Sequence, residues 1–142
     1  ERFLRDRGFD PHGPALPFYR RQFVDCWAEP GFHRFWQVWN PFFGYLLYRL
    51  FILVGGRRWP VPATLLVFMA SGLLLHDLPV LVVTGRYAGT TTVTFLFFGL
   101  AALAGRAVGV EAVLRPRGAA VRVLANVGLV ALGLWLGVVL TG

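Results

Sequence analysis

Long apolar runs that are almost free of charge fill this chain after residue 40 and leave few folds open to it. Five of the seven acidic residues lie before residue 30, and only Asp77 and Glu111 lie beyond it. The whole chain is 56% hydrophobic and 15% charged, whereas an ordinary soluble domain has roughly 25% charged residues. The sequence therefore predicts an integral membrane protein of the all-α class, a bundle of helices in lipid.

The apolar runs predict about four spans, at 42–56, 61–83, 91–110 and 119–140. The first run is interrupted by Arg49 and reaches only roughly 22 Å as a helix, short of the roughly 30 Å hydrocarbon core. We expect it to be tilted, re-entrant or snorkelling, with its helix starting at Pro41. Small residues four apart predict close helix contacts, although glycine is also common in membrane helices generally. They are Ala101, Gly105 and Gly109, and then Gly133 and Gly137.

Two segments precede these spans and divide the chain into an arm, 1–30, and a membrane domain, 31–142. The arm mixes Arg, Asp, Gly and Pro with scattered aromatic residues, which indicates an irregular segment lying against something larger. Residues 31–39 carry four aromatic side chains on one helical face, with His33, Arg34 and Gln37 off that face. This pattern predicts an interfacial amphipathic helix in the membrane plane. The four aromatic residues are Phe32, Phe35, Trp36 and Trp39.

The net charge of +7 comes from fourteen arginines against seven acidic residues, and beyond residue 40 the arginines fall mostly between or at the ends of the apolar runs. Lipid headgroups explain this placement better than nucleic acid does, so we expect the lipid bilayer and membrane proteins as partners. The arginines at 57–58 and 115–117 favour a cytoplasmic location for the first and third connections between the spans. The arm would then lie on the opposite side, and its own arginines favour the reverse orientation. We expect a bacterial cytoplasmic membrane. The first residues lack the apolar stretch of a signal peptide. Because the chain begins at Glu1, we expect it to be processed or part of a longer sequence.

His76 and Asp77 stand inside the apolar run 61–83, where ionisable side chains are costly and mark a functional site by default. A neutral imidazole can take a proton from a hydroxyl nucleophile and return it to a leaving group. Adjacent residues on a helix point about 100° apart, so the two need not form a relay. Three other roles stay open for His76: a hydrogen-bonded bundle residue, an axial ligand of a pigment or haem, or part of a pair that meets water.

Asn40 is the second candidate, at the junction between the aromatic helix and the first apolar run. Its amide could polarise a carbonyl or stabilise an oxyanion. An Asn before a Pro is also an ordinary turn or helix-cap residue. The single cysteine, Cys26, excludes an internal disulfide and a cysteine-rich metal site, and we expect neither a metal nor a bound cofactor.

The order FWQVWNPFFGYLLYRLF, GGRRWP and LLVFMASGLLLHDL resembles the membrane-bound O-acyltransferase family, particularly its wax-synthase-like branch. In that family a tryptophan-rich stretch carries a polar residue, often Asn, some tens of residues before a histidine buried in a span. Asn40 and His76 match these two positions, and the resemblance covers roughly residues 31–110. It implies transfer of an acyl group from a thioester such as acyl-CoA to a hydroxyl, with His76 as general base and Asn40 as its polar helper.

A second function of a different class fits the same features. The small size, the aromatic arm and the glycine pattern suit a non-catalytic membrane subunit that packs against a neighbour in a larger assembly. A photosynthetic or other energy-transducing complex is one such setting, and the subunit could descend from an acyltransferase-like ancestor.

Overall fold

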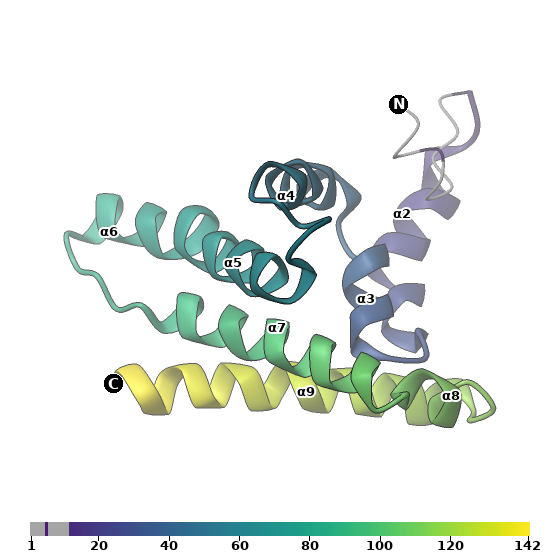
Figure 1. Ribbon diagram of the computed structural model, residues 1–142. Coiled ribbons are helices and arrows are strands. Elements are labelled where there is room, and N and C mark those ends of the chain that lie inside the picture. Colours follow the sequence, from purple (N-terminus) through teal and green to yellow (C-terminus); the bar gives the residue numbers. More distant parts are fainter. Residues whose placement is uncertain (1–4, 6–11) are drawn as a thin grey trace.

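The computed structural model describes residue 5 and residues 12–142, and every regular element in this part of the chain is a helix (Figure 1). Residues 1–4 and 6–11, with two of the aromatic residues of the predicted arm, lie outside the described residues. The elements are α2 (Ala15–Phe23), η1 (Asp25–Ala28), α3 (Phe32–Val38), α4 (Pro41–Leu53), α5 (Pro60–Gly72), η2 (Leu73–Asp77), α6 (Leu78–Thr84), α7 (Thr90–Ala107), α8 (Val110–Leu114) and α9 (Ala119–Thr141).

Within the described residues, three helices are long and apolar enough to cross a membrane, which confirms the predicted helical membrane bundle. They are the continuous run of α5, η2 and α6 over Pro60–Thr84, then α7 and α9, with mean hydropathies of 2.0, 1.3 and 2.3. Their bounds follow the predicted spans closely, except that α7 ends at Ala107. The chain turns there because Gly109 takes a positive φ of 71°, which glycine adopts without strain.

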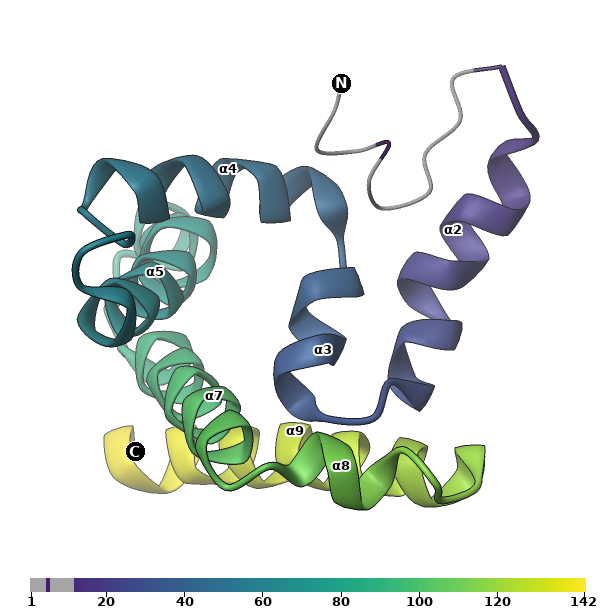
Figure 2. The ribbon, with the colours of Figure 1, turned by 45° about the vertical axis from the view of Figure 1, so that its right-hand side comes forward.

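The short apolar segment is α4, and it lies across the spans instead of beside them. In Figure 1 the helices α5, α7 and α9 run across the view, whereas α4 is seen nearly end-on. Figure 2, turned by 45°, shows α4 along its length. Pro41 is the first residue of this helix, as predicted. A helix of 13 residues that runs crosswise to the spans can lie near the membrane surface, where its length need not match the hydrocarbon core.

Most of the described arginines gather at one end of the bundle. This end, here called the basic end, is where α5 begins, α7 ends and α2 and α3 lie (Figure 1). The arginines of its elements and turns are Arg20, Arg21, Arg34, Arg57, Arg58, Arg106, Arg115, Arg117 and Arg122. Arg86 lies at the opposite end, between α6 and α7. The arm therefore lies on the same side as the two connections that contain the arginines at 57–58 and 115–117. The sequence had placed the arm and these connections on opposite sides.

Two glycines of α9 let that helix approach α7 closely. A Cβ on Gly133 would meet the rings of Phe97 and Phe98, and a Cβ on Gly137 would meet Thr94 Oγ1 and, at 2.8 Å, the backbone oxygen of Thr90. The predicted helix contact is therefore confirmed for Gly133 and Gly137.

The glycines near the end of α7 do not act in this way. A Cβ on Gly105 would be in ordinary contact with Val110 at 3.8 Å, and Gly109 would meet nothing within 4 Å.

Replacing Gly137 by Ala should destabilise the bundle by about 1–3 kcal/mol, because the added methyl overpacks the contact between α9 and α7. Gly128→Ala is the matched control in the same helix, since its Cβ meets nothing within 4 Å. We expect the control to be neutral or slightly stabilising. Unfolding of both variants in mixed detergent micelles measures the difference, and equal stability would show that α7 and α9 do not pack as described.

Helix α3 forms where the aromatic helix was predicted, and its aromatic face packs on protein. Phe32 and Phe35 are 3% and 2% exposed, and they form the core with Cys26, Phe98 and Ala102. The Phe32 and Phe98 rings meet edge-on with their centroids 5.5 Å apart, a favourable aromatic geometry. The aromatic and small side chains of α7 offer this face a complementary surface, which the pattern of α3 alone could not reveal.

The arm is helical over α2 and η1, so the prediction of an irregular segment is wrong for these residues. A buried amide of α9 fixes η1 to the bundle: Asn126 Nδ2 donates to the backbone oxygens of Trp27 and Glu29, both at 2.9 Å. Burial raises the pKa of the Cys26 thiol to about 11, so the cysteine is a packing residue with little thiolate.

Candidate functional site

The predicted histidine lies in a turn of π-helix that interrupts the first long span. Leu73–Asp77 form this turn, η2, between α5 and α6. Such turns insert an extra residue into the helix and occur frequently at functional sites. The side chain of His76 is exposed on the bundle surface, and its ring lies against Phe95 with the centroids 5.3 Å apart. It makes no hydrogen bond to another described residue.

Asp77 points the other way, into the beginning of α7. Its carboxylate accepts hydrogen bonds from the backbone N–H groups of Thr91 and Thr92, at 3.1 and 2.8 Å. The Thr92 hydroxyl adds a third bond of 2.6 Å. The first amides of a helix have no partner within it, and Asp77 caps them from a neighbouring helix. The two adjacent residues therefore do not form a relay in this structure, as their angular separation had indicated.

Asp77→Ala should destabilise the bundle by about 1–3 kcal/mol, because it leaves the buried amides at the start of α7 without their acceptor. Thr92→Val removes only one of the three bonds and should cost less. Detergent unfolding of both variants provides the measurement. An Asp77→Ala variant as stable as the unaltered chain would contradict the capping role.

Asn40 joins α3 to α4 in a left-handed conformation, with φ 43° and ψ 75°. Among the described residues it is the one non-glycine residue with positive φ. Asn tolerates this region better than most residues, yet its side chain makes no cap bond to α4. The cap interpretation therefore lacks its hydrogen bond, although the junction does place Asn40 at the N-cap position.

The structure records no contact between Asn40 and His76, and neither residue lines a cavity described below. Both stay predictions as site residues. They share one property: each lies at a backbone irregularity, and such irregularities gather at functional sites.

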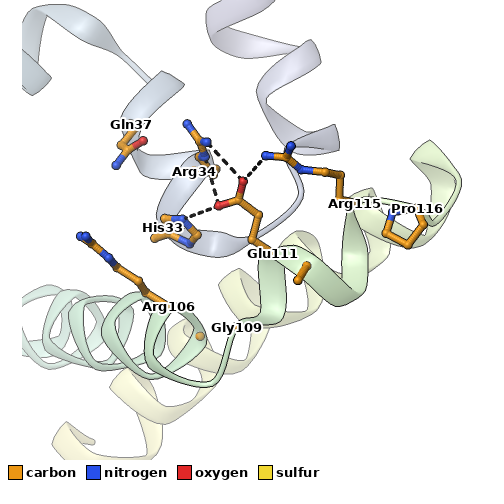
Figure 3. Close-up of a pocket in the computed structure, with 10 residues that line it drawn as sticks. His33, Arg34, Gln37, Arg106, Gly109, Glu111, Arg115 and Pro116 are labelled. Carbon is orange, nitrogen blue, oxygen red and sulfur yellow. Dashed lines mark hydrogen bonds and ion pairs between the residues drawn. The ribbon is translucent and has the colours of Figure 1, made fainter.

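A cluster of charged residues that the sequence did not single out lies at the basic end, between α3 and α8. We call it the interfacial cluster: His33, Arg34, Glu111 and Arg115. His33 Nε2 lies 3.1 Å from Glu111 Oε2, and Arg34 reaches both carboxylate oxygens, at 3.3 and 3.2 Å. Arg115 donates to Oε1 at 2.6 Å. Figure 3 shows the three side chains converging on this carboxylate.

Hydrogen bonds from Arg34, and then from Arg115, lower the pKa of the Glu111 carboxyl to about 2 from its ordinary 4.5. The same bond raises the pKa of Arg34. A carboxyl whose pKa is lower in the folded chain stabilises the fold above its ordinary pKa. That contribution is lost as the pH falls through the folded value.

Glu111→Gln should therefore lower stability at pH 6 and have much less effect near pH 2, where the carboxyl of the folded, unaltered chain is half protonated and most of its contribution is lost. Unfolding midpoints measured between pH 2 and pH 6 test this, with Asp25→Asn as the control. Asp25 pairs with Arg20 at 3.5 Å on an exposed surface, where ion pairs contribute little. A Glu111→Gln effect that did not change with pH would overturn the assignment.

Two cavities meet beside this cluster. The first, called the headgroup pocket, is open and is lined by the cluster together with Gln37, Arg106 and the turn around Gly109 (Figure 3). The second, called the apolar groove, has a volume of about 330 Å³ and lies between α3, α4, α5 and α7. His33, Gln37 and Arg106 line both cavities, so the headgroup pocket and the groove are neighbours at the basic end.

The interfacial cluster had only a faint signal in the sequence. Glu111 is one of two acidic residues beyond residue 30, and His33 and Arg34 are polar positions on an otherwise aromatic helix. The local pattern does not indicate that the two segments meet, because Glu111 lies 78 residues from His33 and 77 residues from Arg34.

Comparison of the chain with protein-family models, curated proteins and solved structures finds no match.

Proposed function

We propose that this chain belongs to a membrane-bound O-acyltransferase, with His76 as the general base. In this reaction the imidazole takes the proton of an acceptor hydroxyl, and the hydroxyl oxygen attacks the carbonyl of a thioester. The thiol leaves with that proton, and an ester forms. Asn40 would donate to the carbonyl oxygen as negative charge develops on it. No metal takes part in this scheme.

The observation that carries the proposal is that the side chains of His76 and Asp77, which are neighbours in the π turn, point in different directions. The carboxylate is fully used in capping α7, whereas the imidazole is exposed and has no hydrogen bond to a described residue. A histidine on the outer face of an apolar span is costly in lipid, so its presence favours a chemical role. The motifs that resemble the family agree with this choice.

A reaction site at His76 needs a further protein segment to enclose it. Only 17–22% of each span is buried within the described chain, and His76 lies on the open surface. A further membrane segment would have to cover this face, from the same protein or from a partner, and would enclose the acyl donor.

His76→Ala should reduce acyl transfer by about 10²–10⁴-fold, the usual contribution of a general base. The assay follows a radiolabelled acyl group from acyl-CoA to a lipid or alcohol acceptor, in membranes that contain the whole protein. Asn40→Ala should lower the rate less, and His33→Gln is the matched histidine control. Unchanged transfer by the His76→Ala variant would make the assignment wrong, and a loss with His33→Gln alone would move the base to the interfacial cluster.

A non-catalytic membrane subunit is the second candidate, favoured by the same open surface. In this case a neighbouring protein covers His76, in an assembly such as a photosynthetic or other energy-transducing complex. Gentle detergent extraction followed by mass spectrometry separates the two candidates: co-purification of partner proteins in fixed ratio favours the subunit. A pigment absorption band that vanished with His76→Ala would favour an axial ligand.

The arginine distribution supports an orientation as well as a location. Loops that are rich in arginine stay in the cytoplasm, so the basic end would face the cytoplasm of a bacterial cell and the Arg86 turn the other side. The three-span arrangement removes the earlier conflict, because the arm and both basic connections then lie on the same side.

A further inference from the structure

The headgroup pocket carries more positive than negative charge. Arg34, Arg106 and Arg115 line it, against the single carboxylate of Glu111. That carboxylate already binds Arg34 and Arg115. Arg106 is left with no ion pair or hydrogen bond to a described residue, and its guanidinium lies apart from the Glu111 carboxylate (Figure 3). The pocket therefore carries a net positive charge, and Arg106 is available to pair with an anion.

The position of the pocket indicates which class of anion could bind to Arg106. Arg106 lies in the last turn of α7, at the end of a membrane span, where lipid phosphates reside. Arginine at this level interacts with anionic headgroups, and its planar guanidinium can bind two phosphate oxygens at once.

The apolar groove begins where the pocket ends. Its wall beyond His33, Gln37 and Arg106 is mostly aromatic and aliphatic, and it includes the rings of Trp36, Tyr48, Phe51, Phe68 and Phe95. Its volume of about 330 Å³ lies at the lower end of the range for ligand pockets. A cationic pocket that leads into an apolar groove is complementary to a phosphate that carries an acyl chain.

We propose that this junction is a specific binding site for an anionic phospholipid. The phosphate pairs with Arg106 at the headgroup pocket, and one acyl chain enters the groove beneath α4. His76 lines neither the pocket nor the groove, although its ring lies against Phe95 of the groove wall, and the proposed lipid site does not depend on the proposed acyl transfer.

Gly44 of α4 offers a means of testing the groove separately from the pocket. It lines the groove, and a Cβ placed on it would meet nothing within 4 Å. Gly44→Leu therefore adds an apolar side chain to the lining of the groove at a position with room for its Cβ, and leucine favours the helix more than glycine does. The variant should fold at least as well as the unaltered chain, so that a loss of lipid binding in it has a direct cause.

Native mass spectrometry of the whole protein in detergent, titrated with phosphatidylglycerol and phosphatidylcholine of identical acyl chains, tests the proposal. We expect preferential binding of one phosphatidylglycerol, about tenfold weaker with Arg106→Gln and also weaker with Gly44→Leu. Arg57→Gln is the control, because Arg57 is a basic-end arginine that lines neither cavity. Thermal unfolding confirms that each variant is folded.

Three results would overturn the proposal. These are equal binding of the two lipids, an Arg106→Gln effect no larger than that of Arg57→Gln, and competition by inorganic phosphate at the concentration at which the lipid binds. The last result would assign a site for free phosphate, with no role for the groove.

Discussion

The packing of α3 on α7 is the interaction on which the rest of the structure depends. It buries Phe32 and Phe35 against Phe98 and so fixes a short helix across the end of a membrane span. Helix α4 follows after a two-residue link, and its crosswise course encloses the apolar groove. The same packing places His33 and Arg34 beside Glu111. One aromatic contact thus positions both the groove and the charged cluster at its mouth.

The features that could be predicted from the sequence are those that local composition decides. Hydropathy located the long spans because an apolar run of sufficient length has few alternatives to a membrane helix. Spacing located the contact of Gly133 and Gly137 with α7, because residues four apart share one helical face. The pattern failed for Gly105 and Gly109, since small residues also serve at helix ends and beside cavities, and spacing does not distinguish these uses.

The features that could not be predicted depend on which segments meet. The pairing of His33 with Glu111 joins positions 78 residues apart, and the bonds of Asn126 end on backbone oxygens of the arm. A hydrogen bond to a backbone oxygen cannot be predicted from the pattern of side chains. The direction of α4 was open for a related reason: its length excluded an upright span, but only contact with α3 and α5 decides between a tilted and a crosswise course.

His76 and Asp77 show how structure can separate two residues that sequence presents as a pair. Capping the first amides of α7 accounts for the carboxylate, because unpaired N–H groups inside an apolar bundle are costly. No comparable structural task falls to the histidine, which has an aromatic neighbour but no hydrogen bond to a described residue. An apolar side chain would serve that surface better if packing in lipid were all that mattered. The presence of His76 is therefore better explained by chemistry, or by what covers it, than by the folding of the described bundle.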